Sequence, residues 1–245
     1  SISWSRIYPN DMDHINPEGI AFYSNLIDEL KSYNIEPFVT LFHWDLPQYL
    51  EEKGGWESEE VIFAFEKYVK TCFEAFGDRV NYLVANFPPE VSDPKRFIQV
   101  THNVHVAHAL AVRAFRKILP NGKIGVANVL DPMYPASDSK EDLEAFKLAE
   151  ACYTHWFYDP IILGEYPEWL LDLAQERFQA PVIQDWQAKL LKEVSIDFVG
   201  VNFYRRKLAA ANTDESNFKI NTTGVKGSSK PFGFKGYFKF VSDPN

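Results

Sequence analysis

Residues 36–42 read EPFVTLF, a short apolar run that follows Pro37 and predicts a buried β-strand. A helical pattern comes next, with apolar residues three or four positions apart at Val61, Phe65, Tyr68, Cys72 and Phe76. This succession recurs along the chain, and strands are expected at residues 1–7, 36–42, 79–85, 123–129 and 196–204. Strands that alternate with helices predict an α/β protein whose parallel sheet is covered by helices.

Helices are expected between these strands. Pro17 is a favourable first-turn residue and opens one of them, and further helical patterns cover residues 104–118, 143–156 and 182–194. Five strands are visible, whereas a closed (β/α)8 TIM barrel needs eight. We expect one domain over residues 1–245, and the family resemblance given below implies that it is a partial barrel. Residues 205–245 are polar and then aromatic, which predicts a long loop region, and any further strand should come from there or from another chain.

Composition narrows the possible partners. The net charge is −9, which disfavours binding to a phosphate backbone, so no nucleic-acid partner is expected. No run approaches the roughly 20 apolar residues that span a bilayer, so no membrane partner is expected either. Only Cys72 and Cys152 occur, which favours a reducing compartment. We expect a cytoplasmic protein without a cofactor or a bound metal.

Several longer motifs are far more specific than these patterns. His43-Trp44-Asp45-Leu46-Pro47, followed by Gly54-Gly55-Trp56, resembles family-1 glycoside hydrolases. The resemblance continues, in the family's order and over about residues 1–204, through Ser3-Trp4-Ser5-Arg6-Ile7, Gly77-Asp78-Arg79-Val80, His102-Asn103, Ala107-His108-Ala109, Asp159-Pro160, Gly164-Glu165-Tyr166-Pro167 and Asp197-Phe198-Val199-Gly200-Val201-Asn202-Phe203-Tyr204.

The resemblance implies a retaining β-glycosidase, similar to the β-glucosidases, that acts on a small-molecule β-glycoside. Such enzymes use two carboxyl groups roughly 5 to 5.5 Å apart, one as nucleophile and the other as acid and base. In this family they are the Glu of an Asn-Glu-Pro motif and the Glu of a later Thr-Glu-Asn-Gly motif. Neither motif occurs here, since the first Glu position falls on Phe87 or Pro88. We therefore expect no catalytic residue in this chain.

The sequence around the broken motif indicates a deletion near residues 83–86, because Phe87-Pro88-Pro89 resembles a stretch that the family carries further downstream. The chain also starts just after the position of the family's nucleophile-contacting Arg and stops before the nucleophile strand. It is expected to be inactive by itself.

Four substrate-binding residues are carried over from the family's motifs: His43, Trp44, Asn202 and Tyr204. In a barrel they would meet in one pocket at the C-terminal ends of their strands. The family's Tyr at position 204 contacts the nucleophile, which leaves Tyr204 here without that partner. Asp45 is expected to cap a turn or helix rather than to bind sugar.

Two other groups of residues have a simpler interpretation. Glu90 is the nearest carboxylate to the broken motif, but it follows two prolines in an expected loop and is not expected to replace the missing acid. His102, His105 and His108 are spaced like metal ligands on one helical face. Their match to a helix of the family favours packing instead.

Three hypotheses remain open on the sequence alone. The chain can be an incompletely represented β-glycosidase. It can be a non-catalytic relative that still binds sugar. It can also be a trimmed barrel fragment whose open sheet edges cause self-association or binding to a complementary fragment.

Overall fold

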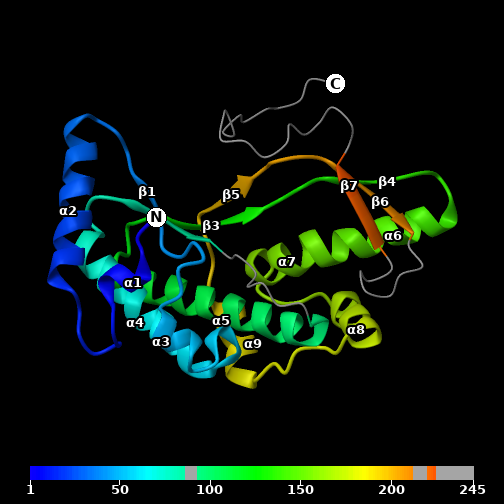
Figure 1. The fold of residues 1–245 in the computed structure, drawn as a ribbon, viewed down its shortest axis with the longest axis horizontal. Coiled ribbons are helices and arrows are strands. Elements are labelled where there is room, and N and C mark those ends of the chain that lie inside the picture. Colours follow the sequence, from blue (N-terminus) through cyan, green and yellow to red (C-terminus); the bar gives the residue numbers. More distant parts are fainter. Residues whose placement is uncertain (86–92, 212–219, 225–245) are drawn as a thin grey trace. The chain divides into compact units, whose positions relative to one another are not determined.

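The computed structural model describes residues 1–85, 93–211 and 220–224 (Figure 1). Contacts divide the chain into two compact units, residues 1–128 with 159–200 and residues 129–158 with 201–245. The first unit contains α1 (Trp4–Ile7), α2 (Pro17–Ser32), β1 (Phe38–Thr40), α3 (Gln48–Glu51), the 3-10 turn η1 (Gly55–Glu57), α4 (Glu59–Phe76), β2 (Asn81–Ala85), α5 (Pro94–Ile118), most of β3 (Ile124–Val129), α8 (Glu168–Arg177), α9 (Asp185–Glu193) and the start of β5 (Phe198–Asn202).

The sheet of the first unit has the strand order β1-β2-β3-β5. β1 and β2 are parallel with Val39 opposite Tyr82, and β2 and β3 are parallel with Val84 opposite Val126. The expected parallel sheet is therefore present, and its strands are a few residues shorter than the runs in the sequence.

The expectation of a strand over residues 1–7 is wrong. Residues 4–7 form the single helical turn α1, in which the Ser3 carbonyl accepts the N–H groups of Arg6 and Ile7. Ile2 donates its N–H to the Thr40 carbonyl of β1 at 2.9 Å. The carboxylate of Asp45 accepts the N–H of Trp4 at 2.8 Å. A residue distant in sequence thus stabilises the start of this helix, and no local pattern reveals it.

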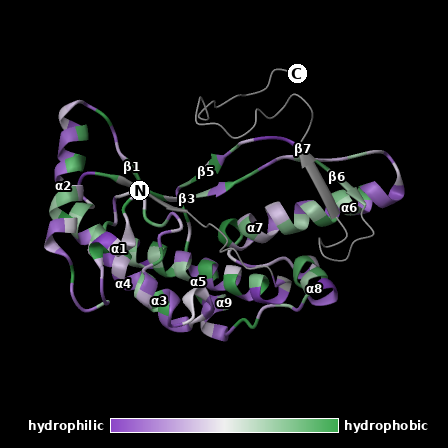
Figure 2. Cartoon of the chain, viewed as in Figure 1, coloured by the Kyte–Doolittle hydropathy of each residue, from purple (hydrophilic) through white to green (hydrophobic). Residues whose placement is uncertain are grey.

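The longer helices begin where short polar side chains cap them. Asn16, Ser58 and Asp93 each accept a backbone N–H from the first turn of α2, α4 and α5, respectively. The expected apolar face of α4 is buried throughout, and this helix lies beside α5 (Figure 1). Each of these helices carries both hydrophobic and hydrophilic residues along its length (Figure 2), as expected for helices that cover a sheet with one face.

The second unit contains β4 (Met133–Pro135), α6 (Lys140–Glu150), the π-turn η2 (Ala151–His155), β6 (Lys207–Ala211) and β7 (Ile220–Gly224); α7 (Trp156–Ile162) spans the boundary. β4 and β6 are parallel, whereas β6 and β7 are antiparallel. β6 and β7 are further strands in the 205–245 segment, as allowed above, although most of that segment was expected to be loop. β4 lies outside residues 205–245. The expectation that any further strand would come from that segment or from another chain is therefore wrong for β4. A single domain over the whole chain stays a prediction.

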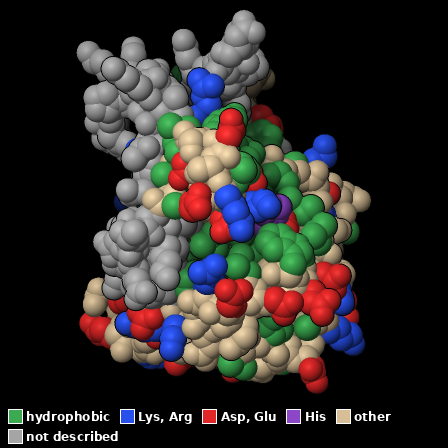
Figure 3. All heavy atoms as spheres, turned by 90° about the vertical axis from the view of Figure 1, so that its right-hand side faces the viewer, with side chains coloured by type: hydrophobic (Ala, Val, Ile, Leu, Met, Phe, Trp, Pro, Cys, Tyr) green, Lys and Arg blue, Asp and Glu red, His purple; other side chains and the backbone are tan. Residues whose placement is uncertain are grey.

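No helix in the described part of the chain is long and apolar enough to cross a membrane. On the face that Figure 3 shows, Lys and Arg side chains lie among Asp and Glu side chains. This face therefore carries charges of both signs.

Candidate functional site

His43 and Trp44 lie just beyond the C-terminal end of β1. Leu41 and Phe42 are buried, and the chain then turns so that the His43 and Trp44 side chains are exposed. Asp45 makes this turn, because its carboxylate accepts the N–H of His43 at 3.2 Å as well as that of Trp4. The expectation that Asp45 is a capping acid is confirmed.

Trp44 has an unusual backbone conformation. Its φ is 66°, in the left-handed region that bulky residues rarely adopt, and its side chain is 64% exposed. Its ring centroid lies 6.2 Å from that of His43, at 43° between planes. Strain of this kind persists only where surrounding contacts impose it, and it concentrates at functional sites. The exposed ring offers an apolar face beside an imidazole, which suits a sugar.

A cluster of buried aromatic side chains holds this turn in place. Trp4 stacks on Tyr68 with centroids 5.1 Å apart, and Phe42 packs edge-on against Trp56 at 5.3 Å. The Tyr68 hydroxyl contacts the carbonyls of Leu41 at 2.8 Å and Ile2 at 3.0 Å. Burial raises the pKa of Tyr68 well above its ordinary value, so this hydroxyl stays protonated and able to donate. The cluster therefore fixes the base from which His43 projects.

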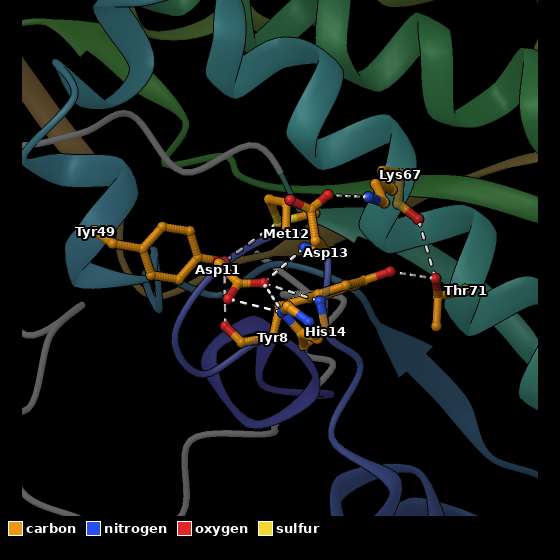
Figure 4. Close-up of polar contacts among 8 residues, drawn as sticks. All are labelled: Tyr8, Asp11, Met12, Asp13, His14, Tyr49, Lys67 and Thr71. Carbon is orange, nitrogen blue, oxygen red and sulfur yellow. Dashed lines mark hydrogen bonds and ion pairs between the residues drawn. The ribbon is translucent and has the colours of Figure 1, made fainter.

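Polar contacts brace the loop between α1 and α2 against α3 and α4 (Figure 4). Tyr49 donates to the Tyr8 carbonyl at 3.2 Å, and the Tyr8 hydroxyl lies 2.8 Å from that of Thr71. Burial raises the pKa of Tyr49 to about 12. Because Tyr49 belongs to α3, which directly follows the His43 turn, this loop holds the turn from its other side.

Asp11 organises the tip of the same loop. Its carboxylate accepts the N–H groups of Asp13 at 2.7 Å and His14 at 2.9 Å, and it contacts the His14 ring at 3.0 Å. The contact with the His14 ring is the main reason that the pKa of Asp11 is lowered. Lys67 of α4 ties the loop down through Asp13 at 3.2 Å.

Asn202 is the last residue of β5, and Tyr204 follows it by two positions. In the strand order, β5 is the edge strand opposite β1. The Asn202 carbonyl accepts the N–H of Leu130 at 3.1 Å, which joins the C-terminal ends of β5 and β3. The Asn202 residue is half-buried, and Tyr204 is 44% exposed. Both belong to the second unit, whereas His43 and Trp44 belong to the first. Their convergence on one pocket therefore stays a prediction.

Sequence patterns missed Asp131, which lies beside Tyr204 in the chain's second unit. Its carboxylate is 3.1 Å from Lys207 Nζ and 3.7 Å from Arg205 Nε, and it accepts the Arg205 N–H at 3.3 Å. Its side chain is only 8% exposed. The one available signal was an acid directly after a strand, too common to be informative. Asp131 fixes the backbone that follows Tyr204.

The two weaker candidates have different outcomes. Glu90 lies outside the described residues. His102, His105 and His108 are buried in α5, where His102 contacts Tyr166 and Gln187 and His105 contacts Tyr166. In the described part of the chain, no group of three or more His, Cys, Asp or Glu residues is arranged to hold a metal ion.

A cavity of about 400 Å³, with both polar and apolar lining residues, lies at the opposite ends of the strands. It is lined by Lys31, Glu36, Gly77, Asp78, Arg79, Val80, Ile118, Leu119, Pro120, Asn121 and Gly122. Glu36, Val80 and Gly122 precede β1, β2 and β3, so this cavity opens where the strands begin. In barrels of βα units the sites lie where strands end, and this cavity is therefore not the candidate site.

The family model of glycosyl hydrolase family 1 matches residues 1–233. The chain belongs to this family. It is 40% identical to the aryl-phospho-β-D-glucosidase BglC of Bacillus subtilis, across all of this chain and 55% of that protein. It is 36% identical to β-glucosidase A of Thermotoga maritima, across 87% of this chain and 51% of that one.

Solved structures of family-1 enzymes agree with this assignment. The Thermotoga maritima family-1 β-glucosidase superimposes with a TM-score of 0.82 at 34% identity, over 91% of this chain and 53% of that chain. The α/β fold is therefore that of the family's TIM barrel, of which the described strands are a part. The chain spans about half the length of the family-1 relatives that it matches.

Proposed function

We propose that the intact protein is a retaining β-glycosidase acting on small-molecule β-glycosides, and that this chain supplies part of its sugar-binding rim. The observation that carries the proposal is the turn after β1, where His43 and a strained, exposed Trp44 project from a rigid aromatic base. Asn202 and Tyr204 are proposed to complete the same rim from the end of β5. The relatives named above support the class of substrate.

The chain by itself is proposed to be inactive. Retaining hydrolysis needs a carboxylate that attacks the anomeric carbon and a second carboxyl group that protonates the leaving oxygen. The sequence carries neither Asn-Glu-Pro nor Thr-Glu-Asn-Gly. Proton transfer alone commonly contributes about 10² to 10⁴-fold, and a binding rim replaces neither group.

An aryl β-glucoside with a good leaving group is the fair test substrate, because it lessens the need for the acid but not for the nucleophile. A sample whose intact mass equals 28.2 kDa should bind it without turnover. His43→Ala should weaken binding about tenfold or more, since an aligned hydrogen bond to a sugar is lost. His14→Ala, on an exposed loop, is the control.

The outcomes separate the proposals. Turnover that Glu90→Gln removes would show that Glu90 is a catalytic acid after all. Turnover that survives this change would point to another carboxylate in the chain. Equal binding by the His43→Ala and His14→Ala variants would refute the rim.

A non-catalytic, sugar-binding relative is a second candidate, favoured by the loss of both motifs while the His43 turn is intact. An intact mass well above 28.2 kDa in the native source would favour the enzyme over this candidate. A cytoplasmic location is also proposed. It is supported by the low cysteine content, since Cys72 and Cys152 are the only two cysteines in the sequence, and thiol labelling in cells would test it.

A further inference from the structure

A buried hydrogen-bond relay joins α5 to the segment 164–193, which contains the Gly164–Pro167 turn, α8 and α9. The Tyr166 hydroxyl lies 3.1 Å from His102 Nδ1 and 2.8 Å from His105 Nδ1. His102 Nε2 lies 3.0 Å from Gln187 Oε1, on α9. All four side chains are buried.

The direction of each hydrogen bond follows from one backbone group. The N–H of Gln184 donates to Gln187 Oε1 at 2.9 Å, which fixes this atom as the amide oxygen. An oxygen can only accept, so His102 must carry its proton on Nε2 and leave Nδ1 as an acceptor. Tyr166 then donates its O–H to His102 Nδ1.

The same logic fixes the second ring. Since the Tyr166 proton is committed to His102, the Tyr166 oxygen must accept from His105, whose proton is therefore on Nδ1. The two histidines are held as opposite tautomers, and the relay runs from His105 through Tyr166 and His102 to Gln187. The bond between Tyr166 and His102 requires the His102 ring to be neutral, because His102 Nδ1 has to accept.

A proton added to His102 Nδ1 would break this order. Two N–H groups would then face the Tyr166 oxygen, and Tyr166 could no longer donate its O–H to His102. An unsatisfied buried donor is costly, and a buried charge without a partner is more so.

Among the residues that the structure describes, no carboxylate shifts the pKa of these rings. Burial lowers the pKa of His102, His105 and His108, and the histidines lower that of His105 further. The charged side chains on the elements around α5 include ion pairs of their own, namely Glu66 with Lys70 and Arg113, Glu57 with Arg96, and Glu165 with Lys192.

We infer that His102, Tyr166, His105 and Gln187 form an acid-sensitive latch that holds residues 164–193 on α5 only while the His102 ring is neutral. Besides the relay, Gln184 Nε2 donates to the Glu59 carboxylate of α4 at 3.5 Å, and two further contacts of this segment contain no titratable group. Gln99 accepts the N–H of Val182 at 2.8 Å, and Phe63 stacks on Trp186 at 5.9 Å. Acid should therefore loosen the segment without unfolding the helices that it covers.

Hydrogen exchange between pH 7 and pH 4.5 tests the latch, with exchange corrected for its intrinsic pH dependence. Each histidine that takes up a proton on opening should raise the opening constant of residues 164–193 up to about tenfold per pH unit. Two rings together should give up to about a hundredfold. Protection of α4 should persist over the same range. Unchanged protection of 164–193, or a loss that coincides with that of α4, would overturn the inference.

Two further measurements make the test specific. His102→Gln should reduce the pH dependence of the opening constant by about tenfold per pH unit. His14→Gln, which replaces an exposed histidine, should leave this pH dependence unchanged. An unaltered slope in the His102→Gln variant contradicts the latch. Nitrogen NMR of the unmodified chain at pH 7 should find the proton on Nε2 of one ring and on Nδ1 of the other. The same tautomer on both rings would refute the relay. This measurement uses the unmodified chain, so it holds even if the His102→Gln variant does not fold.

Discussion

Buried polar side chains differ in whether their polar atoms have hydrogen-bond partners. His102 uses both ring nitrogens, with Tyr166 and Gln187 as partners. His108 lies two helical turns further along α5 and is equally buried, but neither of its ring nitrogens has a hydrogen-bond partner in the structure. The same residue type on one helix therefore stabilises the fold in one place and costs free energy in another.

Replacing these two histidines by leucine should have opposite effects at pH 7. His108→Leu should leave the free energy of unfolding unchanged or raise it by about 1 kcal/mol, because an unsatisfied polar group becomes apolar. His102→Leu should lower it by about 2 kcal/mol, because Tyr166 and Gln187 lose a partner. Denaturant unfolding measures both. A His108→Leu variant less stable than His102→Leu would contradict the assignment.

The pH dependence of His108 adds a second test. Burial lowers its pKa from 6.5 to about 4, so the unfolded chain binds more protons than the folded chain between these values. Stability is therefore lost as the pH falls from 6.5 to 4, by up to about 3 kcal/mol for this residue. His108→Leu should remove that loss, and its advantage over the unmodified chain should grow toward pH 4. An advantage that is the same at pH 7 and pH 4 would show that His108 does not titrate on unfolding.

At the scale of elements, the family's motif residues mostly join one element to the next. Asp197 accepts the N–H of Ile124 at 2.8 Å and pairs with Arg116 at 2.9 Å, which aligns the start of β5 with that of β3. Arg79 connects the end of α4 to Asp28 of α2 at 2.5 Å. A Cβ on Gly77 would lie 2.4 Å from the backbone carbonyl oxygen of Phe73, so only glycine fits there. These motif residues therefore have structural roles in the described part of the chain.

Asp197→Ala should lower the free energy of unfolding by about 2 kcal/mol, since a backbone N–H and a guanidinium lose a charged acceptor. Glu144→Ala is the matched control. Glu144 pairs with Lys140 at 3.8 Å on an exposed helix face and should contribute less than about 0.5 kcal/mol. Comparable losses in the two variants, measured by thermal unfolding, would mean that Asp197 does not align the strands.

Local patterns foresaw the elements that depend on local chemistry. The strands after Glu36, Arg79 and Lys123 and the helix opened by Pro17 are present. The failures came from long-range contacts. Asp45 caps α1 from 41 positions away, which turned an expected strand into a helix. β4 pairs with β6 across some 70 positions of sequence.

The candidate site was only partly visible in the sequence for the same reason. His43, Trp44 and the capping Asp45 belong to one contiguous motif, and their turn could be anticipated. The strained φ of Trp44 and the ion pairs of Asp131 depend on the folded backbone. No residue pattern indicates either of them.

At the scale of the whole molecule, the sheet β1-β2-β3-β5 has two edges in the described part of the chain, at β1 and β5. Phe38 on β1 contacts Phe198 on β5 with centroids 5.9 Å apart, over Gly125 of β3, whose missing side chain makes room for the Phe198 ring. Phe38 nevertheless stays 56% exposed. Side chains of further strands fill such a layer in a closed barrel. Within the described residues, the sheet thus ends at β1 and β5, and part of this apolar layer is exposed.

An open sheet of this kind should cause the isolated chain to associate with itself, because unpaired strand edges and exposed apolar side chains seek partners. We expect light scattering to find a species of about twice the 28.2 kDa of one chain, with a fraction that rises with concentration. Two copies would supply eight parallel strands, the number that a closed barrel contains. Phe38→Lys should shift this equilibrium to the monomer, since a charge would be buried between the copies.

Phe22→Lys is the control for this last prediction, because Phe22 is 48% exposed and belongs to the helix α2 rather than to a strand. Its variant should associate as the unmodified chain does. If Phe22→Lys dissociates the species and Phe38→Lys does not, association proceeds through helices rather than through the sheet. A chain that is monomeric at all concentrations would instead mean that the open sheet is covered from within the same molecule.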